Sequence, residues 1–105
     1  DSRIHACIKL PTNASYPSGH ATEAYLWANL LAEVFPEHKE ALLERAQLVA
    51  WSRVVGGVHY PTDIVAGRML GERLANDFLA QPDVRAALSR VKAEATPFLR
   101  REPAN

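Results

Sequence analysis

Four stretches of helical periodicity, each followed by a proline or a glycine pair, constrain the fold of this chain more than any other feature. Within each stretch the apolar residues recur every three or four positions, which places their side chains on one face of an α-helix. The predicted helices run over 18–35, 37–55, 62–80 and 82–95. No strand-like alternation extends over a useful length. The sequence therefore predicts an all-α fold, a bundle of about four helices.

Two glycines in the third predicted helix indicate how it packs. Gly67 and Gly71 lie one turn apart, and each lowers helix propensity. We therefore expect a neighbouring helix to pack closely against them. Large aromatic residues at helical positions are more often core residues than substrate contacts, and three are predicted to lie in the core: Trp27, Trp51 and Phe78.

The length of 105 residues allows at most one domain. We expect a loop over 1–17, a helical core over 18–95 and a polar tail over 96–105. Twelve basic and twelve acidic residues cancel, so no global field favours nucleic acid, and any anion must be held by a local site. No uncharged stretch approaches the ~18 apolar residues of a membrane span. A single cysteine, Cys7, excludes an internal disulfide and a thiolate zinc site.

The first candidate cluster is Pro17-Ser18-Gly19-His20, at the predicted start of the first helix. A helix N-terminus presents unpaired N–H groups and the positive end of the helix dipole, which together bind anions. Gly19 lets the backbone approach an anion, and the Ser18 hydroxyl can donate to a phosphate oxygen. His20 can transfer a proton near neutral pH. Taken alone, the tetrapeptide is a weak signal, and a plain N-cap followed by a surface histidine is the favoured interpretation.

The second candidate cluster is Ser52-Arg53, His59 and Asp63. Arg53 offers a fork of donors for two phosphate oxygens. If the Asp63 carboxylate bonds one imidazole nitrogen of His59, the other nitrogen is free to attack phosphorus. Two other interpretations remain open at this point. Asp63 can be a plain helix cap beside a loop histidine, or His59 and Asp63 can be metal ligands, although no third or fourth ligand follows at a suitable spacing.

Together, the two clusters resemble the motifs of the type 2 phosphatidic acid phosphatase and vanadium haloperoxidase superfamily. They occur in the same order and about thirty residues apart. The stretches SYPSGHATEAYLWANLLAEV and SRVVGGVHYPTD are most similar to bacterial class A nonspecific acid phosphatases, and the likeness extends from about Asn13 to Ala95.

This resemblance implies an α-helical, metal-free phosphomonoesterase that acts through a phosphohistidine. By resemblance, His59 is the nucleophile, His20 is the general acid and Asp63 orients His59. The implied phosphate-binding residues are Ser18, Gly19 and Arg53. The family needs no cofactor, although vanadate or phosphate can occupy its site. Small phosphate monoesters are the implied substrates, and the implied location is the periplasm or the exterior of the cell.

The sequence departs from the family at one point. The family has a further N-terminal motif, a Lys followed after six residues by Arg-Pro, and no Arg-Pro follows Lys9. We therefore expect this chain to be the C-terminal part of a larger α-helical phosphatase fold, and to be weakly active or inactive alone. Its helices should expose apolar faces, which favours a homo-oligomer or a swapped dimer.

Other functions fit the same motifs. A vanadium-dependent haloperoxidase is one alternative, because vanadate mimics phosphate and is held by the same residues. A non-catalytic, phosphate-binding helical module is another. A lipid phosphatase is disfavoured, since its relatives in this superfamily are membrane proteins with several spans.

Overall fold

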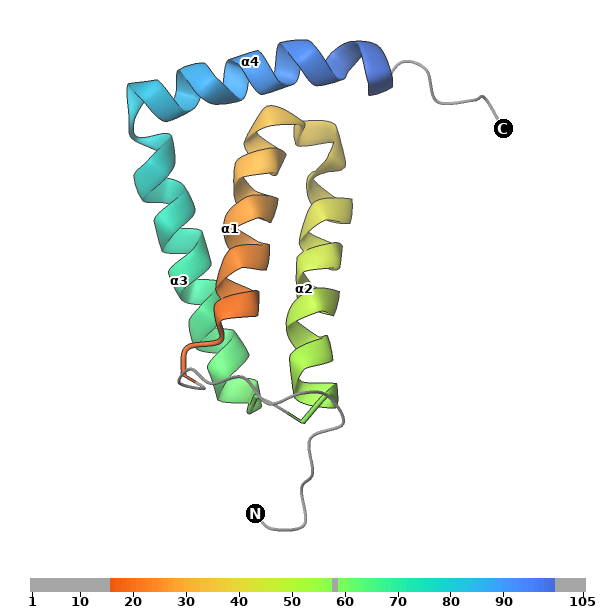
Figure 1. Cartoon of the computed structure of the whole chain (residues 1–105), viewed down its shortest axis with the longest axis vertical. Helices are drawn as coiled ribbons and strands as arrows, with labels where there is room; N and C mark the ends of the chain where they lie inside the picture. Colours follow the sequence, from red (N-terminus) through yellow and green to blue (C-terminus); the bar gives the residue numbers. More distant parts are fainter. Residues whose placement is uncertain (1–15, 58, 100–105) are drawn as a thin grey trace, which may run out of the picture.

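The computed structural model describes residues 16–57 and 59–99, and these residues form helices joined by short turns (Figure 1). The elements are α1 (Gly19–Val34), η1 (Pro36–His38), α2 (Lys39–Val55), α3 (Pro61–Leu79) and α4 (Pro82–Leu99), where η1 is a single 3-10 turn. No strand occurs in the described ranges, which confirms the all-α prediction. Apart from residues 16 and 17, the predicted N-terminal loop lies outside the described residues.

The helix ends coincide with capping residues in the sequence. Ser18 caps α1, because its Oγ accepts a hydrogen bond from the Ala21 N–H at 3.2 Å. α2 ends at Gly56, and Gly57 follows with a φ of 80°, a left-handed conformation that glycine adopts without steric cost. Pro61 occupies the first position of α3, where no backbone N–H is needed.

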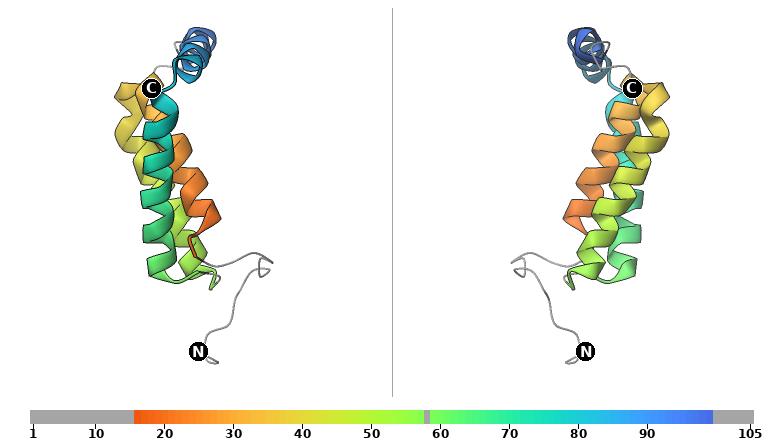
Figure 2. Two further views of the ribbon diagram at one scale, coloured as in Figure 1. Left: turned by 90° about the vertical axis from the view of Figure 1, so that its left-hand side faces the viewer. Right: turned by 90° about the vertical axis from the view of Figure 1, so that its right-hand side faces the viewer.

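The arrangement of the helices brings three helix ends together. α1 packs against both α2 and α3, and α4 lies across the far end of the bundle (Figure 1). α2 runs antiparallel to α1 and α3 runs parallel to it, as the two side views also show (Figure 2). The N-termini of α1 and α3 and the C-terminus of α2 therefore lie at the same end of the bundle. The six predicted site residues all belong to these three ends.

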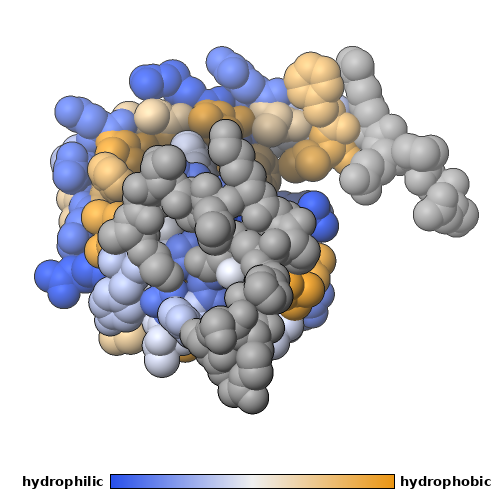
Figure 3. All heavy atoms as spheres, turned by 60° about the horizontal axis from the view of Figure 1, so that its bottom comes forward, coloured by the Kyte–Doolittle hydropathy of each residue, from blue (hydrophilic) through white to orange (hydrophobic). Residues whose placement is uncertain are grey.

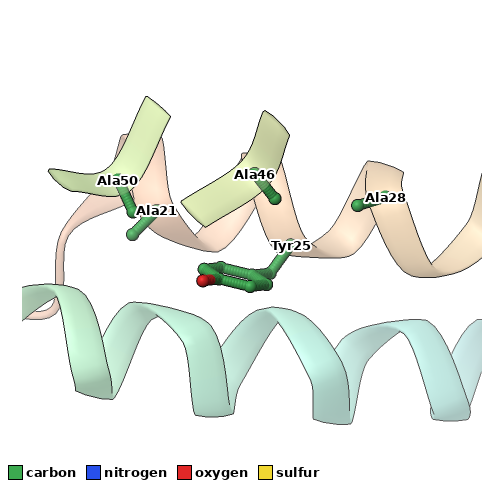
Figure 4. Close-up of a cluster of buried hydrophobic side chains, with 5 residues drawn as sticks. All are labelled: Ala21, Tyr25, Ala28, Ala46 and Ala50. Atoms are coloured by element: carbon green, nitrogen blue, oxygen red, sulfur yellow. The ribbon is translucent and has the colours of Figure 1, made fainter. Parts of the chain in front are cut away.

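Small side chains bring α1 and α2 close together. The buried cluster between the helices consists of Ala21, Tyr25, Ala28, Ala46 and Ala50 (Figure 4). Its members are alanines except for Tyr25, whose ring points toward α3 (Figure 4). The Arg68 guanidinium of α3 lies 5.1 Å from the centre of that ring, a cation–π contact that ties α1 to α3.

Gly67 and Gly71 allow α3 to pack directly against the backbone of α1. A methyl group added at Gly67 would lie 2.7 Å from the Ser18 carbonyl oxygen. One added at Gly71 would lie 2.5 Å from the Thr22 carbonyl oxygen. Both distances are shorter than any real Cβ contact, so a larger residue at either position would push the helices apart. The close packing predicted at these two glycines is confirmed.

α4 is longer than the sequence predicted. The expected end at residue 95 is wrong, because Pro97 lies inside the helix and the helix continues to Leu99. Pro97 supplies no N–H to the Ala93 carbonyl oxygen, but only two helical residues follow it, so little of the helix depends on the missing bond. In the turn before it, the Thr96 hydroxyl donates to the Lys92 carbonyl oxygen at 2.6 Å.

The three aromatic residues assigned to the core lie instead at the surface. The exposed fraction is 59% for Trp27, 50% for Trp51 and 39% for Phe78. The contacts between neighbouring helices are made instead by small residues, the buried alanines and glycines of α1, α2 and α3. The prediction was wrong because helical periodicity marks an apolar stripe without showing which part of it faces a neighbouring helix.

Apolar side chains are also exposed along α2 and α3. Leu48 and Val55 on α2 and Val65 and Met69 on α3 each expose more than half of their surface. When the site end of the bundle is turned forward, apolar patches appear among the polar residues at its edge (Figure 3). The expected exposure of apolar faces is confirmed, whereas homo-oligomer formation stays a prediction. Within the described ranges, none of the helices combines the length and apolarity needed to cross a membrane.

Candidate active site

The N-terminus of α1 is an ordered N-cap followed by an open first turn. Ser18 is fully buried, and its carbonyl oxygen accepts hydrogen bonds from the N–H and the hydroxyl of Thr22 at 3.0 and 2.8 Å. No heavy atom lies within 4 Å of the point where a Gly19 side chain would begin, so the space beside Gly19 is open. His20 follows in the first turn and is exposed. The Ser18 hydroxyl caps the helix through its lone pair and retains its proton for donation.

His59 and Asp63 form a buried pair at the start of α3. The His59 Nδ1 lies 3.5 Å from the Asp63 Oδ2, and the two side chains are 4% and 5% exposed. The same Oδ2 accepts a hydrogen bond from the Tyr60 N–H at 2.8 Å. The carboxylate therefore faces the Nδ1 side of the ring, so Nε2 is the ring nitrogen that points away from Asp63. Because Asp63 lies in the first turn of α3, the helix dipole also stabilises its charge.

A backbone hydrogen bond joins the two clusters. The Ser18 N–H donates to the Asp63 carbonyl oxygen at 3.0 Å. Asp63 thus contacts the α1 N-cap through its main chain, while its side chain contacts His59. The first motif and the residues that follow α2 therefore lie side by side at one end of the bundle.

Arg53 brings a buried donor to the same end of the bundle. It is half-buried in the last turn of α2, and its buried Nε has no hydrogen-bond partner among the residues that the structure describes. Ala50, three residues earlier, packs beside Ala21 of α1 (Figure 4). Because α2 runs antiparallel to α1, Arg53 lies one turn nearer than Ala50 to the end of the bundle where α1 begins. A buried donor without an acceptor costs about 1–3 kcal/mol, so an anion bound here would relieve that cost.

The described residues offer no clear metal site. In the described ranges, His, Cys, Asp and Glu side chains form no group of three or more that could hold a metal ion. His59 and Asp63 form a pair, and the Asp63 carboxylate also accepts the Tyr60 N–H.

The sequence anticipated some of these contacts and missed others. Asp63 was interpreted either as a partner of His59 or as a helix cap, and it is both. The bond from Ser18 to the Asp63 carbonyl and the unpaired Nε of Arg53 were not predicted. Both depend on how distant helices pack, which residue spacing does not reveal.

Comparison with known proteins identifies the family. A family model described as the PAP2 superfamily matches residues 2–85. The chain belongs to the PAP2 superfamily. This confirms the resemblance seen in the sequence, since the matched residues include both motifs.

Curated relatives of this PAP2 chain include several phosphatases. It is 33% identical to a non-specific acid phosphatase of Providencia stuartii over 86 residues, which are 82% of this chain and 35% of that protein. It is 41% identical to an acid phosphatase of Zymomonas mobilis over 61 residues, 58% of this chain and 23% of that protein. An undecaprenyl-diphosphatase of Sulfolobus acidocaldarius is 45% identical over 62 residues, 58% of this chain and 30% of that protein.

The match covers only part of each relative. The chain spans about a third of the length of the Providencia protein, and less of the other two. The substrates of these relatives therefore cannot be assigned to this chain from the match alone.

Proposed function

We propose that the protein containing this chain is an acid phosphatase that hydrolyses small phosphate monoesters through a phosphohistidine at His59. The observation that carries the proposal is the buried Arg53 Nε, which has no partner among the described residues and lies at the same end of the bundle as the α1 N-terminus. An arginine donor and an open helix N-terminus are two anion-binding elements that favour the same ligand. The relatives named as acid phosphatases support the same reaction class.

The proposed first step transfers the phosphoryl group to His59. The Nε2 lone pair forms a bond to phosphorus while the ester P–O bond breaks, and His20 donates a proton to the departing oxygen. Asp63, 3.5 Å from Nδ1, stabilises the positive ring that forms. In the second step water attacks phosphorus, His20 accepts a proton from that water, and the P–N bond breaks to release phosphate.

The phosphate-binding residues stabilise the transition state. Ser18, the Gly19 amide and Arg53 would hold the equatorial oxygens, where positioned donors supply most of the stabilisation in phosphoryl transfer. No metal or organic cofactor has a role in this scheme. Vanadate, with the same charge and geometry as the transferred group, would bind as an inhibitor.

We also propose that this stretch of chain is a weak catalyst by itself. It spans about a third of the Providencia relative, and no Lys-x6-Arg-Pro motif occurs in its sequence. Hydrolysis of p-nitrophenyl phosphate by residues 1–105 at the rate of the intact protein would contradict this. A periplasmic or secreted location rests on the resemblance alone, and cell fractionation tests it.

Trapping the phosphoenzyme tests the proposed function. Acid-sensitive, alkali-stable radiolabel from a labelled phosphate ester should appear in the intact protein and be absent from His59→Ala. The matched control is His38→Ala, since the His38 side chain is 50% exposed on η1 at the far end of the bundle. Phosphate turnover that survives His59→Ala would refute the proposal. Binding of phosphate without turnover, in both proteins, would identify a non-catalytic module instead.

A further inference from the structure

Asp63 contacts both of the segments that contain the two histidines. The Asp63 side chain faces His59, and the Asp63 carbonyl oxygen accepts the Ser18 N–H at 3.0 Å. His20 lies two residues after Ser18, in the first turn of a regular helix. The separation between His20 and His59 is therefore set by how the first turn of α1 lies on the first turns of α3.

Gly67 forms the surface on which that first turn of α1 lies. It follows Asp63 by one turn on the same, buried face of α3. A Cβ at this position would lie 2.7 Å from the Ser18 carbonyl oxygen, 2.8 Å from the Ala21 Cβ and 3.2 Å from the Thr22 nitrogen. These three atoms belong to the N-cap and first turn of α1, the segment that includes His20. Since ordinary contacts begin at 3.4 Å, the first turn of α1 would have to move by about 0.7 Å to admit one methyl group.

We infer that Gly67 is a positioning residue that sets the distance between the acid, His20, and the nucleophile, His59. The inference rests on the proposed function. A methyl group at position 67 would move His20 with α1, whereas His59 and Asp63 would stay with α3. A misplacement near 1 Å can cost about 10²-fold in rate. Ser18 and the Gly19 amide would move with His20 and weaken the reaction of every ester, whereas esters whose leaving group needs a proton would lose the acid as well.

Leaving-group dependence reveals such a displacement. Nitrophenolate departs without a proton, whereas the alkoxide of glycerol 2-phosphate requires one from His20. In Gly67→Ala, kcat/KM for glycerol 2-phosphate should fall at least tenfold more than kcat/KM for p-nitrophenyl phosphate. The ratio of the two values is independent of the amount of folded enzyme, so a loss of stability alone leaves it unchanged. His20→Ala supplies the upper limit of the change in this ratio.

Gly71→Ala is the matched control. A Cβ at Gly71 would lie 2.5 Å from the Thr22 carbonyl oxygen, 3.0 Å from the Leu26 nitrogen and 3.1 Å from the Tyr25 Cβ. The crowding is at least as severe, but it lies one turn further from Asp63. Gly71→Ala should therefore lower the melting temperature as much as Gly67→Ala, and change the ratio of the two kcat/KM values much less, because the α1 N-cap keeps its contact with Gly67.

The outcomes separate the inference from the proposed function. If Gly67→Ala changes the ratio of the two kcat/KM values no more than Gly71→Ala does, Gly67 only packs the helices and the inference fails. Should Gly67→Ala not fold, the double variant Ala21→Gly/Gly67→Ala removes the 2.8 Å contact and must show the same change in ratio. If the unmodified protein hydrolyses neither ester, or His59→Ala remains active, the proposed function itself fails.

Discussion

Replacement of Arg53 by methionine perturbs stability and phosphate binding in opposite directions. Methionine keeps most of the volume of the arginine stem and removes the buried Nε that has no partner within the described ranges. A buried unpaired donor costs about 1–3 kcal/mol. The phosphate-free variant should therefore be more stable than the unmodified protein, by on the order of 1 kcal/mol after the loss of other contacts.

The effect on phosphate binding should be larger. Hydrogen bonds to charged groups contribute about 1.5–3 kcal/mol each, and the arginine fork supplies two. Their loss costs about 3 kcal/mol at the lower end, which corresponds to roughly 10²-fold weaker binding. At a phosphate concentration of about 100 times the original Kd, the unmodified protein gains about 2.7 kcal/mol of stability and the variant about 0.4 kcal/mol.

Calorimetric unfolding of the intact protein, with and without phosphate, measures both effects. Arg73→Met is the control, because the Arg73 side chain is 78% exposed and its ion pair with Asp77 at 3.3 Å is a surface contact of small energetic value. The assignment of Arg53 to the anion site would be refuted by two results together. The phosphate-free Arg53→Met variant would be less stable than the unmodified protein, and phosphate would raise its free energy of unfolding by the full amount.

Three further predictions follow from the geometry. Asp63→Asn should lower kcat/KM about 10²-fold or more. Its free energy of unfolding should change by roughly 1 kcal/mol or less, because the amide oxygen can still accept the Tyr60 N–H. Unchanged kinetics would show that Asp63 has no part in the mechanism. Ala50→Leu should destabilise the protein by about 1–3 kcal/mol in chemical denaturation, since Ala50 is 2% exposed between α1 and α2, and an unchanged unfolding midpoint would contradict this close packing. Dialysis against a chelator should leave kcat/KM unaltered; activity that is lost and then restored by a divalent cation would show that a metal participates.

Sequence patterns predicted the features of the fold that are local. Ser18 and the Gly56-Gly57 pair mark helix ends as predicted, because capping depends on a few neighbouring residues. The burial of Trp27 and Trp51 was predicted wrongly, since the alanine and glycine stripes beside them allow closer helix contacts. Which part of an apolar face becomes an interface is decided by tertiary packing.

The candidate site shows the same division. The pairing of His59 with Asp63 could be predicted, because only three residues lie between them in the sequence. The bond from the Ser18 N–H to the Asp63 carbonyl oxygen joins residues on different helices, and only the packing of α1 on Gly67 places them together. The exposure of Gly19 and His20 was consistent with the motif, but their neighbours emerged only from the fold.

A crystal structure of the intact protein with vanadate would test most directly whether the three helix ends form one phosphate site. The vanadium should be bonded to His59 Nε2, with the Arg53 Nε and the Gly19 amide donating to its oxygens and His20 next to the apical oxygen. Vanadate bound elsewhere, with the Arg53 Nε still buried and unpaired, would contradict the account.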